Sequence, residues 1–438
     1  MRSSTELRED AKLVRAIGLP GLTANIVNTT IGASIFVLPA LVAAMLGAAA
    51  PLAFLVCALA MALFVTSFAI AGSRVTLTGG LYAYVEVAFG PFPGFLAAVL
   101  TFLAATLSVS GVVSLFANSF IALMPTLDSG PGRFLITLII FAALAWINVR
   151  GVRHGTRVVE FVTIVKLLPL LFFVIVGLFF INKGDALAWA WPSGQTLGQG
   201  VLLLIFAFAG VEVALVPSGE VLNPARTVPR AIYLALAITT TLYILIQLVA
   251  QGTLGAELGK FSAAPLAEAA GRFSGAMGRN LLLVGATISA FGYVTSDVLG
   301  SPRTLFALGR DRFLPKIFAH VHARFRTPDV AIVTYCSLCF LLSFSSSFQQ
   351  LAILANVAVL LLYLLGSAAA IALMRRDVRS DGTPFHFTGA GIVPLLAIIV
   401  IIWILTHATR KEFAITGVVL LIAAVLFLFR GKRSGQSG

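Results

Sequence analysis

Apolar runs recur along this chain, and most are about 17–25 residues long, the length of an α-helix that crosses the hydrocarbon core of a bilayer. Apolar residues make up 59% of the 438 residues and charged residues only 11%, about half the share found in soluble domains. This composition excludes a soluble globule and a disordered chain. The sequence therefore predicts an all-α integral membrane protein.

The distribution of basic residues predicts how these runs cross the membrane. With the N-terminus on the cytoplasmic side, the loops on that side hold 22 Lys and Arg residues and the opposite loops hold seven. Such an excess is typical of cytoplasmic loops, so the net charge of +13 does not call for a nucleic-acid partner. We expect twelve helices in the cell (inner, cytoplasmic) membrane with both termini cytoplasmic. The spans are 17–46, 50–72, 92–124, 133–149, 157–181, 197–218, 231–252, 280–302, 329–346, 351–374, 391–409 and 413–430.

Motifs of nucleotide binding and of common enzyme chemistry do not occur in the chain. GxxxxGK[ST], HExxH and GxSxG are all missing. We therefore expect no enzymatic activity, no nucleotide-binding subunit, no cofactor and no metal site, and transport work driven by solute or ion gradients. The positions of the histidines and cysteines fit this expectation. The histidines lie in loops or at span ends: His154, His320, His322, His386 and His407. The cysteines lie within apolar runs: Cys57, Cys336 and Cys339.

Two of the spans contain glycine-bearing interruptions. Residues 32–36 interrupt the first span ahead of Pro39, and residues 206–212 interrupt the sixth ahead of Pro217. Each interruption falls in the first helix of a five-helix set, which is typical of inverted-repeat secondary transporters with a site between the two breaks. Free amides there suit a carboxylate and free carbonyls suit an ammonium, so the pair suits a zwitterion. The alternative is that Gly and Pro are simply common in membrane helices.

Short motifs along the chain resemble those of the amino acid–polyamine–organocation (APC) superfamily, whose members have the LeuT-type fold. The segment 30–36 resembles the G-x-G-[IV]-F motif of the first helix in this superfamily. The other matching segments, in the superfamily's order, are Thr78-Gly79-Gly80-Leu81-Tyr82-Ala83-Tyr84 with Phe89-Gly90, Asn148-x-x-Gly151, 206–212 with Glu220-x-x-Asn223-Pro224 and Pro229-Arg230-Ala231, and 302–328 with Leu314-Pro315 and Thr327-Pro328.

The resemblance implies a bacterial amino acid permease with a LeuT-like 5+5 inverted repeat, helices 1 and 6 broken, and two further helices. Its domains would be a cytoplasmic tail (1–16), the first repeat (17–181), the second repeat (197–374), helices 11 and 12 (391–430) and a second tail (431–438). The expected partners are a small-molecule amino acid and the lipid bilayer, with the protein a monomer or weak dimer.

The resemblance also implies a substrate site at the two breaks. Amides near Ala33 and Ser34 would bind the α-carboxylate, and Phe206 would help to occlude the site. Carbonyls of Thr30, Phe206 and Ala209 would bind the α-ammonium. Ser34 departs from the superfamily motif, which has glycine there. The full predicted set is Thr30, Ile31, Gly32, Ala33, Ser34, Phe206, Ala207, Phe208, Ala209 and Gly210.

Lys166 is the ionisable residue placed deepest in the membrane. It lies about nine residues into the fifth span, so about 14 Å deep at roughly 1.5 Å per residue. An ionisable group at that depth predicts a functional site. In proton-coupled members of the superfamily, a lysine here takes the place of sodium and touches helices 1 and 8. Lys166 would then carry the coupling proton, with Ser289 as a partner and no sodium site. The alternative is a permanently charged tie between helices.

Other charged residues lie near the breaks or the cytoplasmic ends of the spans. Glu212 follows the second break, where it either senses protons, as the matching glutamate of acid-resistance arginine antiporters is implicated in doing, or bonds to free amides. Asp297 is predicted to pair with Arg303. Glu220, Arg230, Asp297 and Arg303 are candidates for an inner gate, and Glu160 for a pair with a loop arginine.

The sequence thus favours a secondary active transporter of amino acids that works by alternating access, as a proton symporter. The first alternative is an exchanger of amino acids or amines in which Lys166 is structural. A channel, a receptor and a membrane-embedded enzyme are less favoured, because the chain shows no rings of like polar residues, no large soluble domain and no clustered catalytic set. Candidate pocket residues favour small or apolar neutral substrates: Ser108, Ser110, Phe208 and Asn356.

Overall fold

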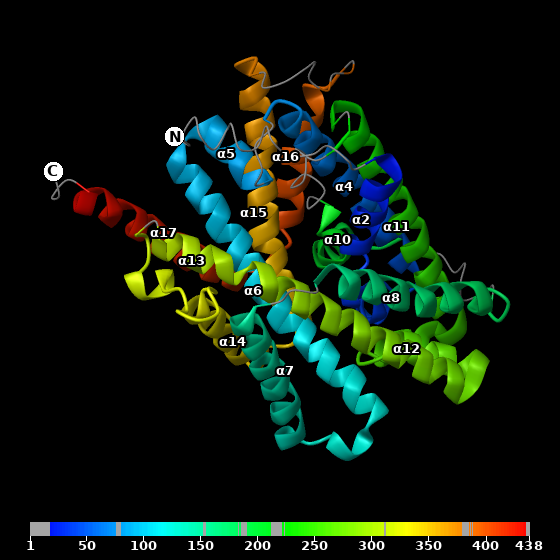
Figure 1. The fold of residues 1–438 in the computed structure, drawn as a ribbon. Helices are drawn as coiled ribbons and strands as arrows, with labels where there is room; N and C mark the ends of the chain where they lie inside the picture. Colours follow the sequence, from blue (N-terminus) through cyan, green and yellow to red (C-terminus); the bar gives the residue numbers. More distant parts are fainter. Residues whose placement is uncertain are drawn as a thin grey trace.

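A computed structural model of the chain describes residues 18–75, 80–151, 155–182, 184, 191–211, 221–222, 224–310, 312–378, 385, 387 and 389–434. Within these residues the protein is helical and contains no strand (Figure 1). The helices are α2 (Leu19–Thr30), η1 (Ala33–Phe36), α3 (Leu38–Leu46), η2 (Gly47–Ala49), α4 (Ala50–Gly72), α5 (Leu81–Phe89), α6 (Pro91–Leu123), η3 (Pro125–Leu127), α7 (Gly130–Arg150), α8 (Gly155–Gly177), α10 (Gly194–Phe208), α11 (Pro224–Leu254), η6 (Gly255–Lys260), α12 (Pro265–Gly300), α13 (Pro302–Arg310), η7 (Lys316–Ala319), α14 (Asp329–Ser343), α15 (Phe348–Arg375), α16 (Ile392–Leu405) and α17 (Arg410–Ser434).

The lengths and composition of these helices are those of a multi-pass membrane protein. Seven helical stretches of the described chain are long and apolar enough to cross a membrane, and four shorter helices are also apolar. The seven are Leu38–Gly72, Pro91–Leu123, Gly130–Arg150, Arg226–Lys260, Pro265–Arg310, Phe348–Arg375 and Arg410–Phe429, and the shorter ones are Lys166–Gly177, Gly194–Phe208, Asp329–Ser343 and Ile392–Leu405.

Helix starts follow from local sequence. The hydroxyls of Ser129 and Ser193 accept hydrogen bonds from backbone amides in the first turns of α7 and α10. Ser347 and Gln350 form a reciprocal capping box at the start of α15. In α12 the backbone turns at Gly275, so a separate helical segment precedes the predicted span 280–302.

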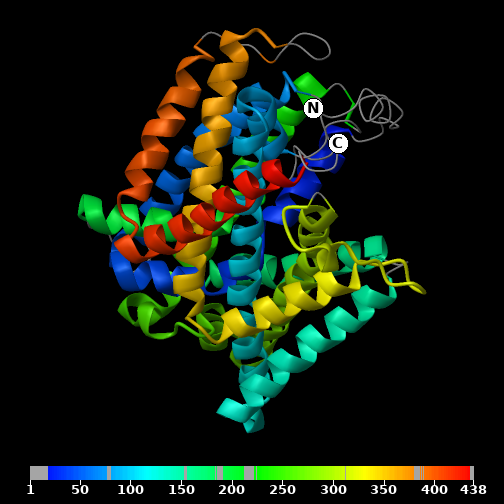
Figure 2. The same cartoon turned by 90° about the vertical axis from the view of Figure 1, so that its left-hand side faces the viewer.

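The long helix α6 forms the centre of the packing. It lies beside α15 and also packs against α12, and α17 lies across α6 and α15 (Figure 2). On the other side of α12, α8 runs along it (Figure 1). The interrupted helix formed by α2, η1 and α3 packs against α11, α10 and α12. This arrangement surrounds the first interruption with helices from both halves of the chain.

Glycine permits the close contact between α8 and α12. A β-carbon on Gly285 would lie 2.6 Å from Cγ and 2.8 Å from Cβ of Pro169, a rigid ring that cannot yield. We expect Gly285→Ala to lower stability by about 1–3 kcal/mol through overpacking. The measurement is the apparent Tm of the purified protein in detergent. Gly300→Ala is the control, because its added β-carbon meets no atom within 4 Å, and equal Tm values for the two variants would contradict the prediction.

Candidate functional site

The first interruption lies where the motif at 30–36 places it. Helix α2 ends at Thr30, Ile31 and Gly32 are extended, and the short helix η1 follows before α3 starts at Leu38. The predicted carboxylate-binding residues Ala33 and Ser34 are buried at the start of η1. A β-carbon on Gly32 would meet no atom within 4 Å, so there is empty space beside the backbone at this break.

The second interruption begins where α10 ends at Phe208. Ala209 is extended, and Gly210 has a φ of +111°, in the left-handed region that favours glycine. The end of α10 therefore falls within the interruption predicted at 206–212 of the span 197–218. Glu212 and Glu220, along with the rest of 212–220, lie outside the described residues.

The two interruptions are in contact, although they are 181 residues apart in the sequence. The Thr29 hydroxyl lies 3.3 Å from the Gly210 carbonyl oxygen, and it shares its one hydrogen between this oxygen and the carbonyl oxygens of Asn25 and Ile26 in its own helix, each 3.0 Å away. A β-carbon on Gly210 would stand 3.0 Å from the Thr29 carbonyl oxygen. Only a glycine allows this approach without displacing the end of α2. The end of α2 and the end of α10 thus form one site built from two distant segments.

Side chains from two other helices bind the carbonyls at the end of α2. The last four carbonyls of an α-helix have no partner within the helix. Lys166 of α8 donates from Nζ to the Asn28 carbonyl oxygen at 2.6 Å, and Tyr243 of α11 donates to the Thr30 carbonyl oxygen at 3.0 Å. The Lys166 residue is only 9% exposed. A cation at a helix C-terminus is favoured by the helix dipole, which gives the buried ammonium a physical reason to lie there.

Ser289 is buried on α12, and its hydroxyl has no hydrogen-bond partner. It follows Gly285 by one helical turn, and Gly285 packs against Pro169, three residues beyond Lys166. The Lys166 ammonium donates to the Asn28 carbonyl of α2 and not to Ser289. The direct pairing of Lys166 with Ser289 is therefore not formed in this structure.

Asp297 and Arg303 do not form the expected ion pair. The Asp297 carboxylate accepts a hydrogen bond of 2.5 Å from the Tyr335 hydroxyl of α14. The exposed Arg303 guanidinium instead donates to the Leu299 carbonyl near the end of α12. Six residues along a helix correspond to about 600° of rotation, so the two side chains start on different faces. The α12 helix also ends at Gly300, between them. Arg230, the remaining described candidate for an inner gate, is exposed near the start of α11.

The aromatic and amide candidates pack between helices. Phe206 makes an edge-to-face contact with Phe348 at the start of α15, with ring centroids 5.4 Å apart. Phe208 is fully buried against the Tyr243 ring. Asn356 of α15 donates to the Leu202 carbonyl of α10 at 2.7 Å. These contacts tie α10 to α15 and α11. Ser110 instead donates to Thr106 within α6.

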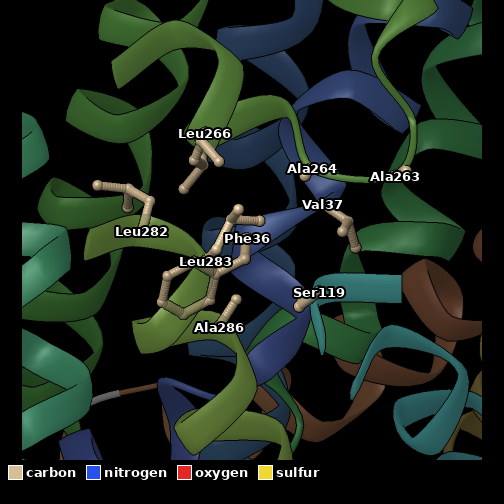
Figure 3. A pocket seen from close by; sticks show the side chains of 10 residues that line it. Phe36, Val37, Ser119, Ala263, Ala264, Leu266, Leu282, Leu283 and Ala286 are labelled. Atoms are coloured by element: carbon tan, nitrogen blue, oxygen red, sulfur yellow. The ribbon is translucent and has the colours of Figure 1, made fainter. Parts of the chain in front are cut away.

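A small apolar pocket adjoins the first interruption (Figure 3). Phe36 and Val37, which follow the break, form one wall, and α12 and the segment before it form the others. Its lining is apolar except for Ser119 of α6: Phe36, Val37, Ser119, Ala263, Ala264, Leu266, Ala267, Leu282, Leu283 and Ala286. The pocket offers contact to aliphatic groups and little hydrogen bonding.

The family model described as amino acid permease matches residues 17–429. The chain belongs to the amino acid permease family of the APC superfamily. It is a membrane transporter and not an enzyme. Similar proteins include the serine/threonine exchanger SteT of Bacillus subtilis, 29% identical over 89% of this chain and 90% of the relative. The branched-chain amino acid permease BcaP of the same organism is 25% identical over 97% and 95%. The large neutral amino acids transporter small subunit 2 of Oryctolagus cuniculus is 27% identical over 77% and 66%.

Tyr243 is not among the residues predicted from the sequence, although it contacts both interruptions of the permease. Its hydroxyl lies 3.0 Å from the carbonyl oxygens of Thr30 and Ala207. A signal was present in the sequence, because Thr239, Tyr243, Gln247 and Gln251 recur every four residues in a mainly apolar span. That spacing places polar groups on one face of a helix. The permease also pairs Asp297 with Tyr335, and no local pattern connects those two residues.

Proposed function

We propose that this permease is a secondary active transporter of neutral amino acids that works by alternating access, with proton symport as its mode. The observation that carries the proposal is the contact between the ends of α2 and α10. Broken helices that meet within a bundle are how transporters of this kind build a polar site inside the membrane. The relatives named above for serine and threonine, branched-chain and large neutral amino acids support the substrate class.

In this proposal the chain has the LeuT-like arrangement of twelve helices, with repeats over 17–181 and 197–374 followed by two helices, and both termini cytoplasmic. The amides of Ala33 and Ser34 bind the substrate carboxylate. Carbonyls at the ends of α2 and α10 bind the ammonium. The empty space beside Gly32 supports a substrate position next to these groups.

Lys166 is the proposed proton carrier. Its ammonium binds the Asn28 carbonyl at the end of α2. Loss of the proton would leave a neutral amine whose remaining N–H groups bind this carbonyl more weakly, so α2 would be held less firmly. An ammonium at this place also leaves no role for sodium. The transporter would thus couple the protonation of one amine to the position of one interrupted helix.

Exchange is the second candidate mode, and two observations favour it. One relative is named an exchanger. The hydrogen bond from Lys166 to α2 is also what a permanently charged tie between helices would form. In that case Lys166 would hold α2 in place throughout the cycle, and substrate on the opposite side would be needed for each return step.

Reconstitution into liposomes distinguishes the two modes. Uptake of radiolabelled L-serine, L-threonine and L-leucine would be measured in empty and in amino-acid-loaded vesicles, with a pH-sensitive dye inside. Symport predicts uptake into empty vesicles with acidification of the lumen. Exchange predicts uptake only into loaded vesicles and no acidification. Failure of all three amino acids under both conditions would overturn the proposed substrate class.

A further inference from the structure

One side of α7 is apolar and exposed. Leu135, Ile139 and Trp146 are exposed over 52%, 57% and 58% of their surface. Their spacings of four and seven residues place them on the same side of the helix. Because α7 is long and apolar enough to cross a membrane, this side is open to the acyl chains of lipids. Arg150 is the last residue of α7, and it is exposed on the same side one turn beyond Trp146.

The Arg150 guanidinium lies over the ring of Trp146, with 4.0 Å between its central carbon and the ring centroid. This is a cation–π contact. Tryptophan is enriched where membrane helices pass from the hydrocarbon core to the headgroups. The pair therefore marks the end of α7 as the level of the lipid phosphates. A planar guanidinium binds a phosphate group through two parallel hydrogen bonds.

The segment before α14 is attached to this end of α7. The Thr327 hydroxyl donates to the Val149 carbonyl oxygen at 2.5 Å. A β-carbon on Gly151 would lie 3.9 Å from Cγ2 of Thr327. The helix α14, which begins at Asp329, packs along α7 (Figure 1). The residues that precede Thr327 are therefore held at the end of α7.

These residues form a hydrogen-bonded loop. The His322 amide donates to the Thr327 carbonyl oxygen, and the Arg326 amide donates to the His322 carbonyl oxygen, each at 2.9 Å. The amides of Arg324 and Phe325 donate to His322 Nδ1 at 3.2 Å and 3.3 Å. Arg326 has a φ of +57°, which is uncommon for a residue other than glycine and is often found at functional sites. The loop thus presents the exposed side chains of Arg324 and Arg326 from a fixed backbone.

Arg150, Arg324 and Arg326 together form an arginine patch. Within the described part of the chain, no carboxylate forms an ion pair with any of the three. The stretch 302–327 holds six Lys and Arg residues and one acidic residue, which lies outside the described residues. The Asp329 carboxylate that follows lies 2.7 Å from a histidine nitrogen of the same segment. The positive charge of the patch is therefore available to an anionic ligand.

We propose that the arginine patch binds the phosphate of an anionic phospholipid, whose acyl chains lie along the exposed apolar side of α7. Two observations favour a lipid over a soluble phosphate. The apolar side of α7 leads directly to the patch, and the tryptophan at its end packs against one of the arginines. A bound lipid would hold the end of α7 and the loop before α14 together. The inference goes beyond the proposed function, and its test measures binding and not transport.

A lipid titration tests the inference. Phosphatidylglycerol is added to the purified protein in a neutral detergent, and the apparent Tm is recorded at each mole fraction of lipid. Phosphatidylcholine carries the phosphate without net charge, and inorganic phosphate carries the charge without acyl chains. We expect the Tm to rise with phosphatidylglycerol and with neither control. An equal rise with either control would overturn the inference, as would the absence of a rise with phosphatidylglycerol.

Variants of the patch locate the site. The double variant Arg324→Gln/Arg326→Gln is expected to lower the apparent affinity for phosphatidylglycerol about thirtyfold, as for two basic groups near an anionic membrane surface. Arg150→Gln is expected to lower it about fivefold. Without lipid, each Tm should equal that of the wild type, because these side chains are exposed. Wild-type affinity in either variant would overturn the inference, because the helix and the loop would then not share one site.

The matched control is the double variant Lys260→Gln/Arg272→Gln. It removes the same amount of charge from exposed side chains, but both of these already pair with Glu257. We expect it to keep the affinity of the wild type within about twofold. A loss as large as that of the patch variant would show that net charge, and not the patch, attracts the lipid, and would overturn the inference.

Discussion

Lys166→Ala is expected to abolish the dependence of uptake on external pH and to reduce its rate at least about tenfold. The substitution removes the amine that donates to the Asn28 carbonyl at the end of α2. In the wild type, protonation of this amine strengthens the hydrogen bond by adding a charge, and loss of the proton weakens it. Alanine leaves α2 without that switch, so proton binding no longer biases its position. The measurement is initial uptake in liposomes over a series of external pH values.

Two further variants separate the role of the charge from that of the side chain. Lys166→Met keeps the length of the apolar stem and removes the charge, so it should behave as alanine does. Lys316→Ala removes an exposed lysine of the η7 segment and should leave uptake unchanged. A Lys166→Ala protein that transports with the pH profile of the wild type would rule out the coupling role. Slow uptake with an unaltered pH profile would support the structural tie.

Gly210→Ala is expected to eliminate transport, for two reasons that act together. The φ of +111° is outside the range that alanine tolerates, at a cost of order 1–3 kcal/mol. The added β-carbon would also stand 3.0 Å from the Thr29 carbonyl oxygen and 3.6 Å from the Thr30 α-carbon. The two ends must therefore separate. The measurements are uptake in liposomes and the apparent Tm in detergent, both of which should fall.

Gly32→Ala, unlike Gly210→Ala, is expected to leave the stability of the protein unchanged, but it should also impair transport. Gly32 has a φ of −100°, which any residue adopts, and its β-carbon would meet no atom. We expect the wild-type Tm, and weaker uptake because the methyl group enters the space proposed for the substrate. Gly417→Ala in α17, which also adds a β-carbon into open space, is the control. Wild-type uptake by Gly32→Ala would show that this space is not part of the site.

The motif at the second interruption could not show which side chain Phe206 packs against. Its position at the second interruption implied that it covers the substrate. In the structure its ring lies edge-on against Phe348, which belongs to a helix that begins more than a hundred residues later in the sequence. Asp297 makes the same point, because its nearest basic residue in the sequence was Arg303 and its partner is Tyr335. The spacing of residues along a helix determines the face on which each side chain lies. The packing of the neighbouring helix determines which residue that side chain contacts.

The sequence by itself determined the all-helical membrane class and the interruption around residues 32–36. Each of these depends on residues close in the chain: the length of an apolar run, or a glycine followed by a proline. Only the tertiary structure decided that α2 and α10 touch, that Lys166 binds the Asn28 carbonyl and that Tyr243 reaches both helix ends. Those contacts join residues 36 to 213 positions apart, where the packing of whole helices, and not any local pattern, brings a donor to an unpaired carbonyl.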